Sequence, residues 1–410
     1  MDIKDLFCSG SGNEDFVDDE ILNFAEENGG VPFYLFRTDR ALDNLAAIRE
    51  CLGNQTRIAY SVKANPWIAG AVSSQAEYLE VCSAGELEFC MHSGIPGDKI
   101  VLDGVYRDDA LMERALSMRV KRIVINSAAQ MRMFLELPAD MRKPEVLLRV
   151  NSGNQFGMEK EEAAACVRMC ENRRDIHLPG IQYYPGTQRQ FCRQIRQELA
   201  QLDEWICFFE NRLPGSLRVI EFGAGIGTPC FEGEEYGEYL SMFQMLSEYV
   251  KERSGRYQVV YESGRNIAAS SGIYVTKVFA VRRICGRKTV FCHGGTNHLN
   301  YDGGILGIRT PYINVRSRHP LGTTETCMIC GSLCSESDVL VRNAEIDQGI
   351  DIGDYICFEN AGAYAATNSP NLFLMMEMPA VILYEKDAGA FSESARIVRS
   401  RRPTEKLLYD

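Results

Sequence analysis

The sequence predicts an α/β plus all-β protein, in which a (β/α)8 barrel is followed by a C-terminal β-barrel or sandwich. Three observations support this prediction: eight short β-rich runs between about residues 55 and 275, helical patterns between these runs, and strands with few helices after Gly272. Strands that alternate with helices indicate parallel βα units, and eight such units fit a closed barrel. A doubly wound sheet is the alternative architecture.

The eight runs of the predicted barrel are rich in Val, Ile and Tyr and end in small or polar residues. In chain order they are RIAYS (57–61), YLEVCS (78–83), KIVLDG (99–104), RIVINS (122–127), EVLLRV (145–150), LPGIQYY (178–184), RVIEFGAG (218–225) and QVVYESG (258–264). Helical spacing of apolar residues is clearest in residues 108–120 and 234–255. We expect the barrel domain to cover residues 31–275.

The second domain is expected to consist of residues 1–30 and 276–410. Its predicted strands lie in the runs at 273–284, 288–295, 338–346, 354–362 and 372–385. The run VRSRRPTEK near the C-terminus is interpreted as a solvated tail. Because no Pro- or Ser-rich linker separates the two domains, we expect them to pack closely.

Composition favours a cytoplasmic enzyme that acts on small molecules. The chain of 410 residues has a net charge of −12, which argues against a nucleic-acid or anionic-membrane partner. The first residues are acidic and lack an apolar core, so we expect no secretory signal. The fifteen cysteines are an odd number and are dispersed, which favours reduced thiols. The spacing of Cys327, Cys330 and Cys334 fits no common metal site, and we expect no metal.

Polar residues stand where the predicted barrel strands end, and the active site of a (β/α)8 barrel lies at those ends. Lys63 follows RIAYS directly, and Arg149, Glu262 and Arg265 occupy similar places after later runs. A single lysine of this kind is most often a surface residue whose stem covers apolar neighbours. Convergence with other strand ends is what favours a functional role for Lys63.

A glycine-rich turn follows the seventh run, at Gly223, Gly225 and Gly227. Glycines there let backbone N–H groups surround a phosphate, and the nearby Arg265 suits a bidentate phosphate contact. Taken singly, the G-x-G-x-G pattern is equally compatible with a tight turn. A lysine, a phosphate-binding loop and a buried carboxylate together are what pyridoxal phosphate requires.

Seven motifs carry a resemblance to a known family. In order they are YSVKANP, EVCSAGE, NQFGM, EFGAGIG, YESGR, CGSLCSESD and NAGAY. This series resembles the ornithine/diaminopimelate decarboxylases, the fold-type III pyridoxal phosphate enzymes, over essentially the whole chain. The resemblance implies an alanine racemase-like two-domain fold, pyridoxal 5′-phosphate as cofactor, and a homodimer whose β-domain contributes to the active site.

The family's functional residues match positions of this sequence. The resemblance implies that Lys63 bonds to the cofactor aldehyde and that Glu262 pairs with the pyridine nitrogen. It implies that Cys334 reaches the active site of a second subunit and takes part in protonating the product. The matching phosphate-binding residues are Gly225, Gly264, Arg265 and Tyr364.

Departures from the family pattern fall on the substrate side. Tyr184 stands where the family has a histidine stacked on the cofactor ring. Ser335 replaces an acidic residue that contacts the distal amine of ornithine or diaminopimelate, with Glu336 one step later. We therefore expect a substrate whose distal group is neutral, acidic or conjugated, with Arg309 as a candidate partner for an acidic group.

The stretch GGTNHL is similar to a subgroup in natural-product and siderophore pathways, one member of which acts on a carrier-tethered glutamyl group. The favoured function is therefore α-decarboxylation of an amino acid, either free or carried by a protein. A racemase on the same fold is one alternative, although Glu262 favours decarboxylation. A non-catalytic regulator is the other, although the chain retains Lys63 and the phosphate-binding residues.

Overall fold

The computed structural model describes residues 17–138, 142–210, 212–213, 217–234, 236–301, 308–385 and 394–407. The N-terminal segment in which we expected no secretory signal lies outside the described residues, except for its last part. The chain divides into two compact units. The barrel unit contains Leu45–Gly227 and Tyr236–Asn266, and the sheet unit contains Asp2–Asn44, Thr228–Glu235 and Ile267–Asp410.

The barrel unit is a closed barrel of eight parallel strands in chain order, as predicted. Its strands are β2 (Arg57–Ser61), β3 (Tyr78–Val81), β4 (Ile100–Leu102), β5 (Arg122–Ile125), β6 (Glu145–Val150), β7 (Gly180–Tyr183), β8 (Val219–Phe222) and β9 (Gln258–Ser263). The register between β9 and β2 places Glu262 beside Ala59, and this pairing closes the ring. A layer of small and branched side chains fills the interior: Ala59, Val101, Val124, Leu147, Val219 and Val260.

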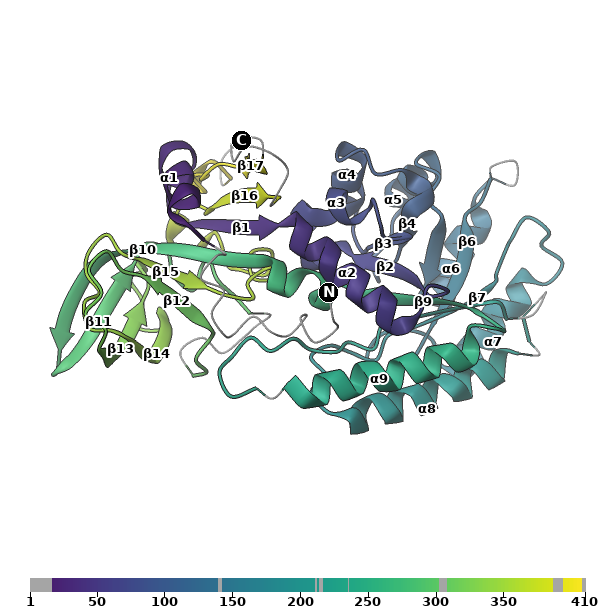
Figure 1. The fold of residues 1–410 in the computed structure, drawn as a ribbon. Helices are drawn as coiled ribbons and strands as arrows, with labels where there is room; N and C mark the ends of the chain where they lie inside the picture. Colours follow the sequence, from purple (N-terminus) through teal and green to yellow (C-terminus); the bar gives the residue numbers. More distant parts are fainter. Residues whose placement is uncertain are drawn as a thin grey trace. The chain divides into compact units, whose positions relative to one another are not determined.

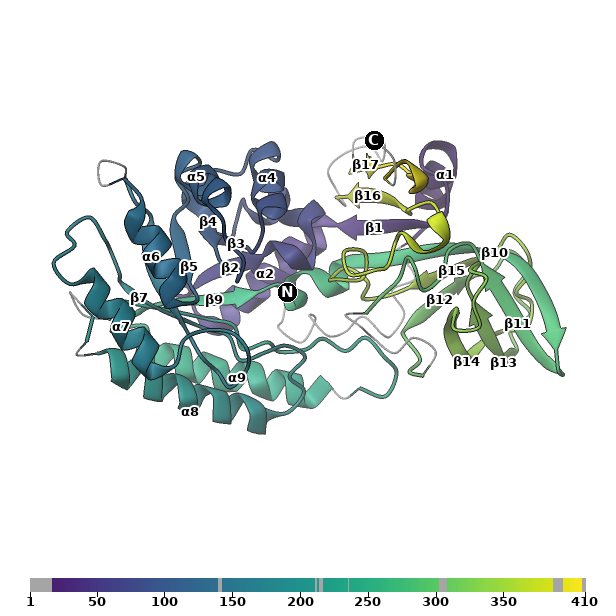
Figure 2. The same ribbon diagram turned by 180° about the vertical axis from the view of Figure 1, so that it is seen from behind.

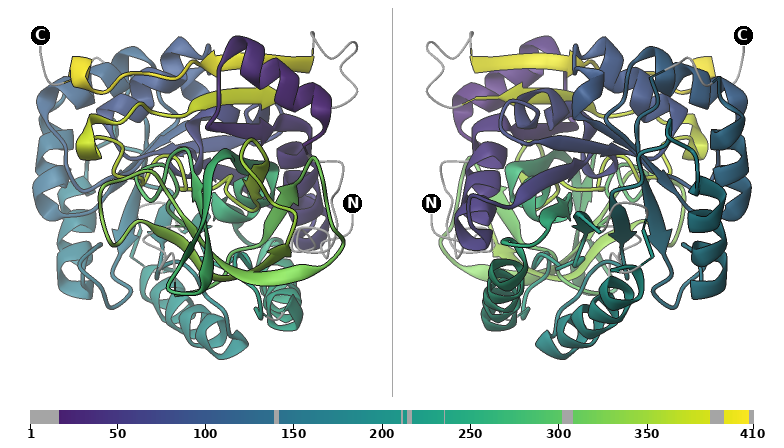
Figure 3. Two further views of the ribbon diagram at one scale, coloured as in Figure 1. Left: turned by 90° about the vertical axis from the view of Figure 1, so that its left-hand side faces the viewer. Right: turned by 90° about the vertical axis from the view of Figure 1, so that its right-hand side faces the viewer.

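Helices surround the barrel strands, as Figures 1 and 3 show. They are α2 (Thr38–Leu52), α3 (Ala69–Val72), α4 (Ala84–His92), α5 (Asp109–Ser117), α6 (Ala128–Glu136), α7 (Lys160–Cys170), α8 (Cys192–Phe209), α9 (Tyr236–Arg253) and α10 (Arg265–Ala268). Side-chain caps start several of them directly after a strand, because a short polar side chain satisfies the first free N–H groups. Ser83 accepts from Glu86 N at 3.2 Å, and Ser127 accepts from Gln130 N at 3.3 Å.

The sheet unit is built on a nine-stranded sheet, with helix α1 (Asp19–Asn28) beside it (Figure 2). Its strands are β1 (Phe33–Arg37), β10 (Gly272–Ile284), β11 (Arg287–Cys292), β12 (Ile313–Arg316), β13 (Thr324–Cys330), β14 (Val339–Asp347), β15 (Tyr355–Phe358), β16 (Ala380–Tyr384) and β17 (Ala395–Arg399). Its core joins α1 to Phe33, Leu35, Val275 and Ile382.

The structure differs from the expected division at 31–275 because strand β1 belongs to the other sheet. Residues Phe33–Phe36 are buried, and β1 pairs antiparallel with β10 and parallel with β16. The interpretation of the C-terminal run as a solvated tail is also wrong at its start, since Val398 and Arg399 lie in β17. Cys327 and Cys330 are buried in β13. Among the described residues, no helix is long and apolar enough to cross a membrane.

Candidate active site

Lys63 lies in a cavity at the carboxyl end of the barrel strands. Strand β2 ends at Ser61, and a single 3-10 turn, Val62–Ala64, carries the lysine directly after it. Asn65 then starts the next turn, where its side chain accepts from Trp67 N at 3.1 Å and its carbonyl accepts from the Tyr60 hydroxyl at 2.8 Å. The cavity has a volume of about 460 Å³, and its lining includes Lys63, Tyr184 and Glu262. Every residue that lines it belongs to the barrel unit.

The Lys63 ammonium is held by a buried carboxylate. Its Nζ donates to both oxygens of Glu80 at 2.6 Å and lies 3.5 Å from the Cys82 sulfur. The Cys82 thiol donates to Glu80 Oε1 at 2.8 Å. Burial would raise the pKa of Glu80, but the Lys63 charge and the hydrogen bonds from Cys82 and Lys63 outweigh it and lower this pKa to about 2. Glu80 therefore fixes the position of the amine.

Glu262 is buried on strand β9 and faces the same cavity. It accepts from Gln182 Nε2 at 2.8 Å. Burial raises the pKa of Glu262 well above its usual range, and the neighbouring acids Glu80, Glu221 and Asp103 raise it further. A cation at this carboxylate would bring the pKa down again, so the site is suited to a protonated ring nitrogen.

A second buried ion pair stands beside the first. Arg149 Nη1 donates to Asp103 Oδ2 at 2.6 Å, and Asn126 Nδ2 donates to Asp103 Oδ1 at 3.0 Å. Possible metal-ligand atoms of Glu80, Cys82 and Asp103 lie within 4.8 Å of one another. Because Lys63 and Arg149 already neutralise these two carboxylates, the cluster is better described as a pair of ion pairs than as a cation site.

Tyr184 lies against the glycine-rich loop that follows β8. A Cβ on Gly223 would stand 2.8 Å from the Tyr184 ring. Gly225 has φ 59°, and a Cβ there would stand 1.8 Å from the Gly186 carbonyl oxygen. The turns after β7 and β8 are joined by hydrogen bonds of 2.9 Å from Arg189 N to Gly225 O and from Gly227 N to Arg189 O. Gly225 is therefore required by the close approach of two backbones, and Gly223 by the close approach of the Tyr184 ring.

The residues of this loop also fit a phosphate. Ala224 and Ile226 are buried, and within the described residues the N–H groups of Ala224, Gly225 and Ile226 make no hydrogen bond. Buried N–H groups almost always have a partner, and three neighbouring donors are suited to an anion. Arg265 is buried at the start of α10, after Gly264.

The other predicted residues lie in the sheet unit. Tyr364 has φ 65°, a conformation that non-glycine residues adopt mostly where the surrounding structure enforces it. Cys334 and Glu336 are exposed and Ser335 is half-buried, with its Oγ 2.8 Å from Ser337 Oγ. Arg309 forms an ion pair with Glu234 and lies 4.2 Å from the centre of the Phe231 ring. A substrate acid would therefore compete with Glu234 for Arg309.

The polar residues of the cavity that were not singled out from the sequence include Glu80, Cys82, Asp103 and Gln182. The sequence could have pointed to them, because each is a charged or polar residue within or next to a buried parallel strand. Such strands are usually continuous apolar runs. Glu80 interrupts YLEV and Gln182 interrupts GIQY, while Asp103 follows IVL directly. Each of these side chains stands at or near the carboxyl end of its strand, where barrel enzymes hold their functional groups.

Comparison with known proteins identifies the family. Residues 39–269, more than half of the chain, match the pyridoxal binding domain of the pyridoxal-dependent decarboxylases. The chain belongs to the pyridoxal-dependent decarboxylase family. It is 26% identical over 86% of its length to an L-glutamyl-[BtrI acyl-carrier protein] decarboxylase of Niallia circulans, of which the match covers 88%. It is 24% identical over 93% of its length to a diaminopimelate decarboxylase of Zymomonas mobilis, of which 92% is covered.

The fold is shared with solved structures of the family. The diaminopimelate decarboxylase of M. jannaschii superposes with a TM-score of 0.79 at 19% identity, over 94% of this chain and 93% of that one. The chain is thus a pyridoxal phosphate-dependent amino-acid decarboxylase with a (β/α)8 barrel and a β-domain. When bound, pyridoxal phosphate supplies an electron sink for the pair left behind by carbon dioxide.

Proposed function

We propose that this decarboxylase removes the α-carboxylate of an amino acid whose distal group is neutral, acidic or conjugated, including one carried by a protein. The observation that supports this proposal is that the carboxylates lining the cavity already have partners. Glu80 binds Lys63, Asp103 binds Arg149, and Glu262 accepts from Gln182 and is suited to the cofactor nitrogen. A distal ammonium would therefore lack a counter-charge in this cavity, and an unpaired buried charge costs about 3–5 kcal/mol.

The segment Ser335–Glu336 supports the same substrate class. It is a turn, with Asp338 N donating to Ser335 O at 3.1 Å and Leu333 N donating to Asp338 Oδ2 at 2.8 Å. In this turn Glu336 is exposed and Ser335 is the more buried of the two. A serine hydroxyl can hydrogen-bond a neutral or conjugated group but cannot neutralise an ammonium.

The proposal extends to the residues that hold the cofactor. Lys63 is the attachment point, Glu262 pairs with the ring nitrogen, Tyr184 lies against the ring, and the loop at Gly223–Gly227 with Arg265 holds the phosphate. The family resemblance adds Tyr364 to the phosphate-binding residues. The assignments within the barrel unit rest on the cavity, on loop N–H groups that make no hydrogen bond to the described part of the chain, and on the burial of Glu262 and Arg265.

The protein is further proposed to act as a cytoplasmic homodimer in a specialised biosynthetic pathway. Cys334 is exposed, as a thiol that reaches a second subunit must be before assembly. In this proposal Cys334 of one subunit, or Lys63 of the other, returns a proton to Cα after carbon dioxide leaves. The relative that acts on a glutamyl group of an acyl-carrier protein supports a specialised pathway.

A substrate panel tests the proposed substrate class. Carbon dioxide release is measured with ornithine, lysine and meso-diaminopimelate, and with free glutamate, a citryl-conjugated amino acid and a glutamyl-loaded carrier protein. We expect low kcat/KM for the first three and a higher value for at least one of the others. High activity on a basic amino acid that is lost in Glu336→Gln would place the enzyme with the ordinary basic-amino-acid decarboxylases.

The attachment of the cofactor has its own test. Borohydride reduction of the holoenzyme followed by peptide mapping should place the label on Lys63, because its Nζ lies in the cavity with Glu262. Lys63→Ala should lose the label together with turnover. A label on another lysine would contradict the assignment.

A further inference from the structure

A second cavity in the barrel unit lies at the opposite ends of the strands. It has a volume of about 520 Å³ and is lined by the segments that lead into β4, β5 and β6, together with His177 before β7. In a parallel barrel the amino ends of the strands share one face and the carboxyl ends the other. This cavity is therefore separate from the one that holds Lys63, and none of its lining residues belongs to that site.

The walls of the cavity are held in place by backbone contacts. Lys121 N donates to Gly97 O at 3.0 Å and to Ile100 O at 2.9 Å, which fixes the end of α5 against the turn Gly97–Lys99. A Cβ on Gly97 would stand 1.7 Å from the Met118 carbonyl oxygen, so the two backbones touch. A preformed cavity of this volume is within the range that small ligands occupy, about 300–1,000 Å³.

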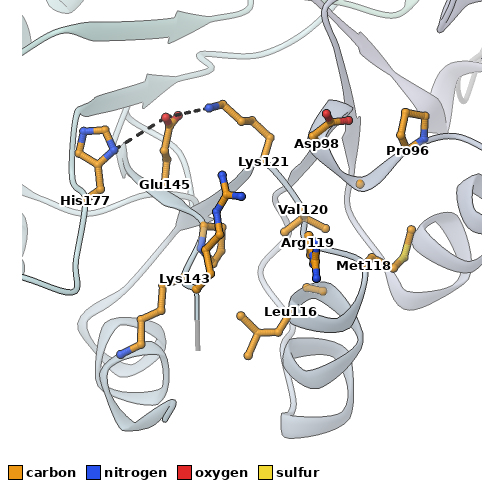
Figure 4. A pocket seen from close by; sticks show the side chains of 14 residues that line it. Pro96, Asp98, Leu116, Met118, Arg119, Val120, Lys121, Lys143, Glu145 and His177 are labelled. Atoms are coloured by element: carbon orange, nitrogen blue, oxygen red, sulfur yellow. Dashed lines mark hydrogen bonds and ion pairs between the residues drawn. The ribbon is translucent and has the colours of Figure 1, made fainter. Parts of the chain in front are cut away.

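The lining has an excess of positive charge on a chain whose net charge is −12. Four cationic side chains line it, with two carboxylates, Asp98 and Glu145. Glu145 is already neutralised, since Lys121 donates to it at 2.9 Å and Arg122 at 2.8 Å, with His177 Nδ1 3.8 Å away. Figure 4 shows Lys121 and His177 both directed toward Glu145. Lys143 points instead to Asp175, at 2.7 Å.

Two guanidinium groups remain for a ligand. Arg119 and Arg142 both line the cavity and are exposed, and within the described ranges neither guanidinium group has a hydrogen bond or an ion pair. Figure 4 places Arg119 on the side of the cavity opposite His177 and Glu145. Arg142 comes from the other wall, the segment before β6.

Arg119 has a backbone conformation that lowers stability when the residue carries a side chain. Arg119 has φ 56° and follows α5, where Val120 N donates to Ala115 O at 3.1 Å and Arg119 N to Leu116 O at 3.0 Å. Glycine is the favoured residue at this position of a helix end, because it has no Cβ. An arginine at this position is less stable than a glycine would be. This difference is consistent with a functional role for the guanidinium group.

We propose that this cavity binds a phosphate monoester of a small organic molecule. Guanidinium groups match phosphate oxygens in bidentate geometry, and Arg119 and Arg142 present two of them from separate segments. Pro96, Leu116 and Val120 supply apolar wall for the organic part. The site is distinct from the phosphate-binding loop of the cofactor and does not depend on which amino acid the enzyme decarboxylates.

Calorimetric titration of the holoenzyme with phenyl phosphate tests this proposal. Unbound pyridoxal phosphate is removed first, because the bound cofactor keeps its own phosphate site filled while free cofactor, itself a phosphate monoester, would compete for the cavity. Wild type should bind phenyl phosphate, and Arg119→Gln/Arg142→Gln should bind it at least about tenfold more weakly. The control Arg132→Gln/Arg168→Gln removes the same charge from exposed positions outside the cavity and should bind within about twofold of wild type.

A second variant distinguishes loss of phenyl phosphate binding from loss of folding. Arg119→Gly suits the backbone at this position and should raise the melting temperature while weakening phenyl phosphate binding. Absence of binding to wild type, equal affinity in the double variant and its control, or binding of citrate in place of phenyl phosphate would overturn the proposal.

Discussion

The ion pair between Lys63 and Glu80 is expected to stabilise the apoenzyme strongly, and Lys63→Met measures this contribution. The substitution leaves the Glu80 carboxylate buried without its ammonium partner. Lowering the pKa of Glu80 from 4.5 to about 2 corresponds to about 3 kcal/mol, since one pKa unit is worth about 1.4 kcal/mol. The Lys63 side chain is 39% exposed, so we take the lower end of the cost of breaking a buried pair, about 3 kcal/mol.

The pH dependence of this loss has a definite sign. In wild type the folded pKa of Glu80 is depressed, so its contribution is complete above pH 4.5 and is lost as the pH falls toward 2. In Lys63→Met, burial without a partner raises the pKa of Glu80, and the variant recovers stability as the pH falls and the carboxyl is protonated. The difference between the two proteins should therefore be largest near pH 8 and smaller at pH 5.

Urea unfolding followed by tryptophan fluorescence is the appropriate measurement. The chain contains two tryptophans, Trp67 and Trp205, and both belong to the barrel unit. Their fluorescence therefore reports the unit that contains the ion pair. The double variant Lys63→Met/Glu80→Gln should lose less than the sum of its single variants, because a neutral amide does not need the ammonium. Equal stability of wild type and Lys63→Met at pH 8, or a difference that is constant with pH, would refute the reasoning.

Two further predictions concern the composite site and the glycine loop. Mixed Lys63→Ala and Cys334→Ala proteins should recover up to about a quarter of wild-type activity, because half of the random dimers carry one intact site of two; no recovery despite proven subunit exchange would exclude shared sites. Gly225→Ala should weaken pyridoxal phosphate binding by about tenfold or more, since its Cβ would meet the Gly186 oxygen at 1.8 Å. Gly237→Ala, with open space around it, is the matched control and should bind normally.

The barrel could be predicted because each of its strands leaves a local signal. In a parallel sheet both faces are covered, so every strand reads as a short apolar run. The runs at β2 to β9 all correspond to observed strands. Strand β1 has the same composition but was not assigned to the correct sheet, because its partners β10 and β16 are more than two hundred residues away. Strand pairing over such distances has no local signature.

The site could be predicted in part for the same reason. The position of Lys63 after β2 follows from the end of an apolar run, and its presence in one cavity with Glu262 follows from barrel closure. The partner of Lys63 could not be predicted, because Glu80 lies seventeen residues away on a neighbouring strand whose register only the fold defines. The turn at Ser335 could not be predicted from the sequence either, since one of its hydrogen bonds joins two backbone groups, Asp338 N and Ser335 O.

The charge balance of the barrel interior explains why these groups occur together. Four acids, Glu80, Asp103, Glu221 and Glu262, are buried at 2%, 1%, 0% and 6% exposure, and the cations that pair with them are Lys63, Arg149 and Arg122. Among the described residues, Glu262 is the one of these four acids that forms no ion pair. Burial raises the pKa of Glu221 to about 7 and raises the pKa of Glu262 well above its usual range. We infer that Glu262 is where a fourth cation restores the balance, and a protonated pyridine nitrogen is a cation of that kind.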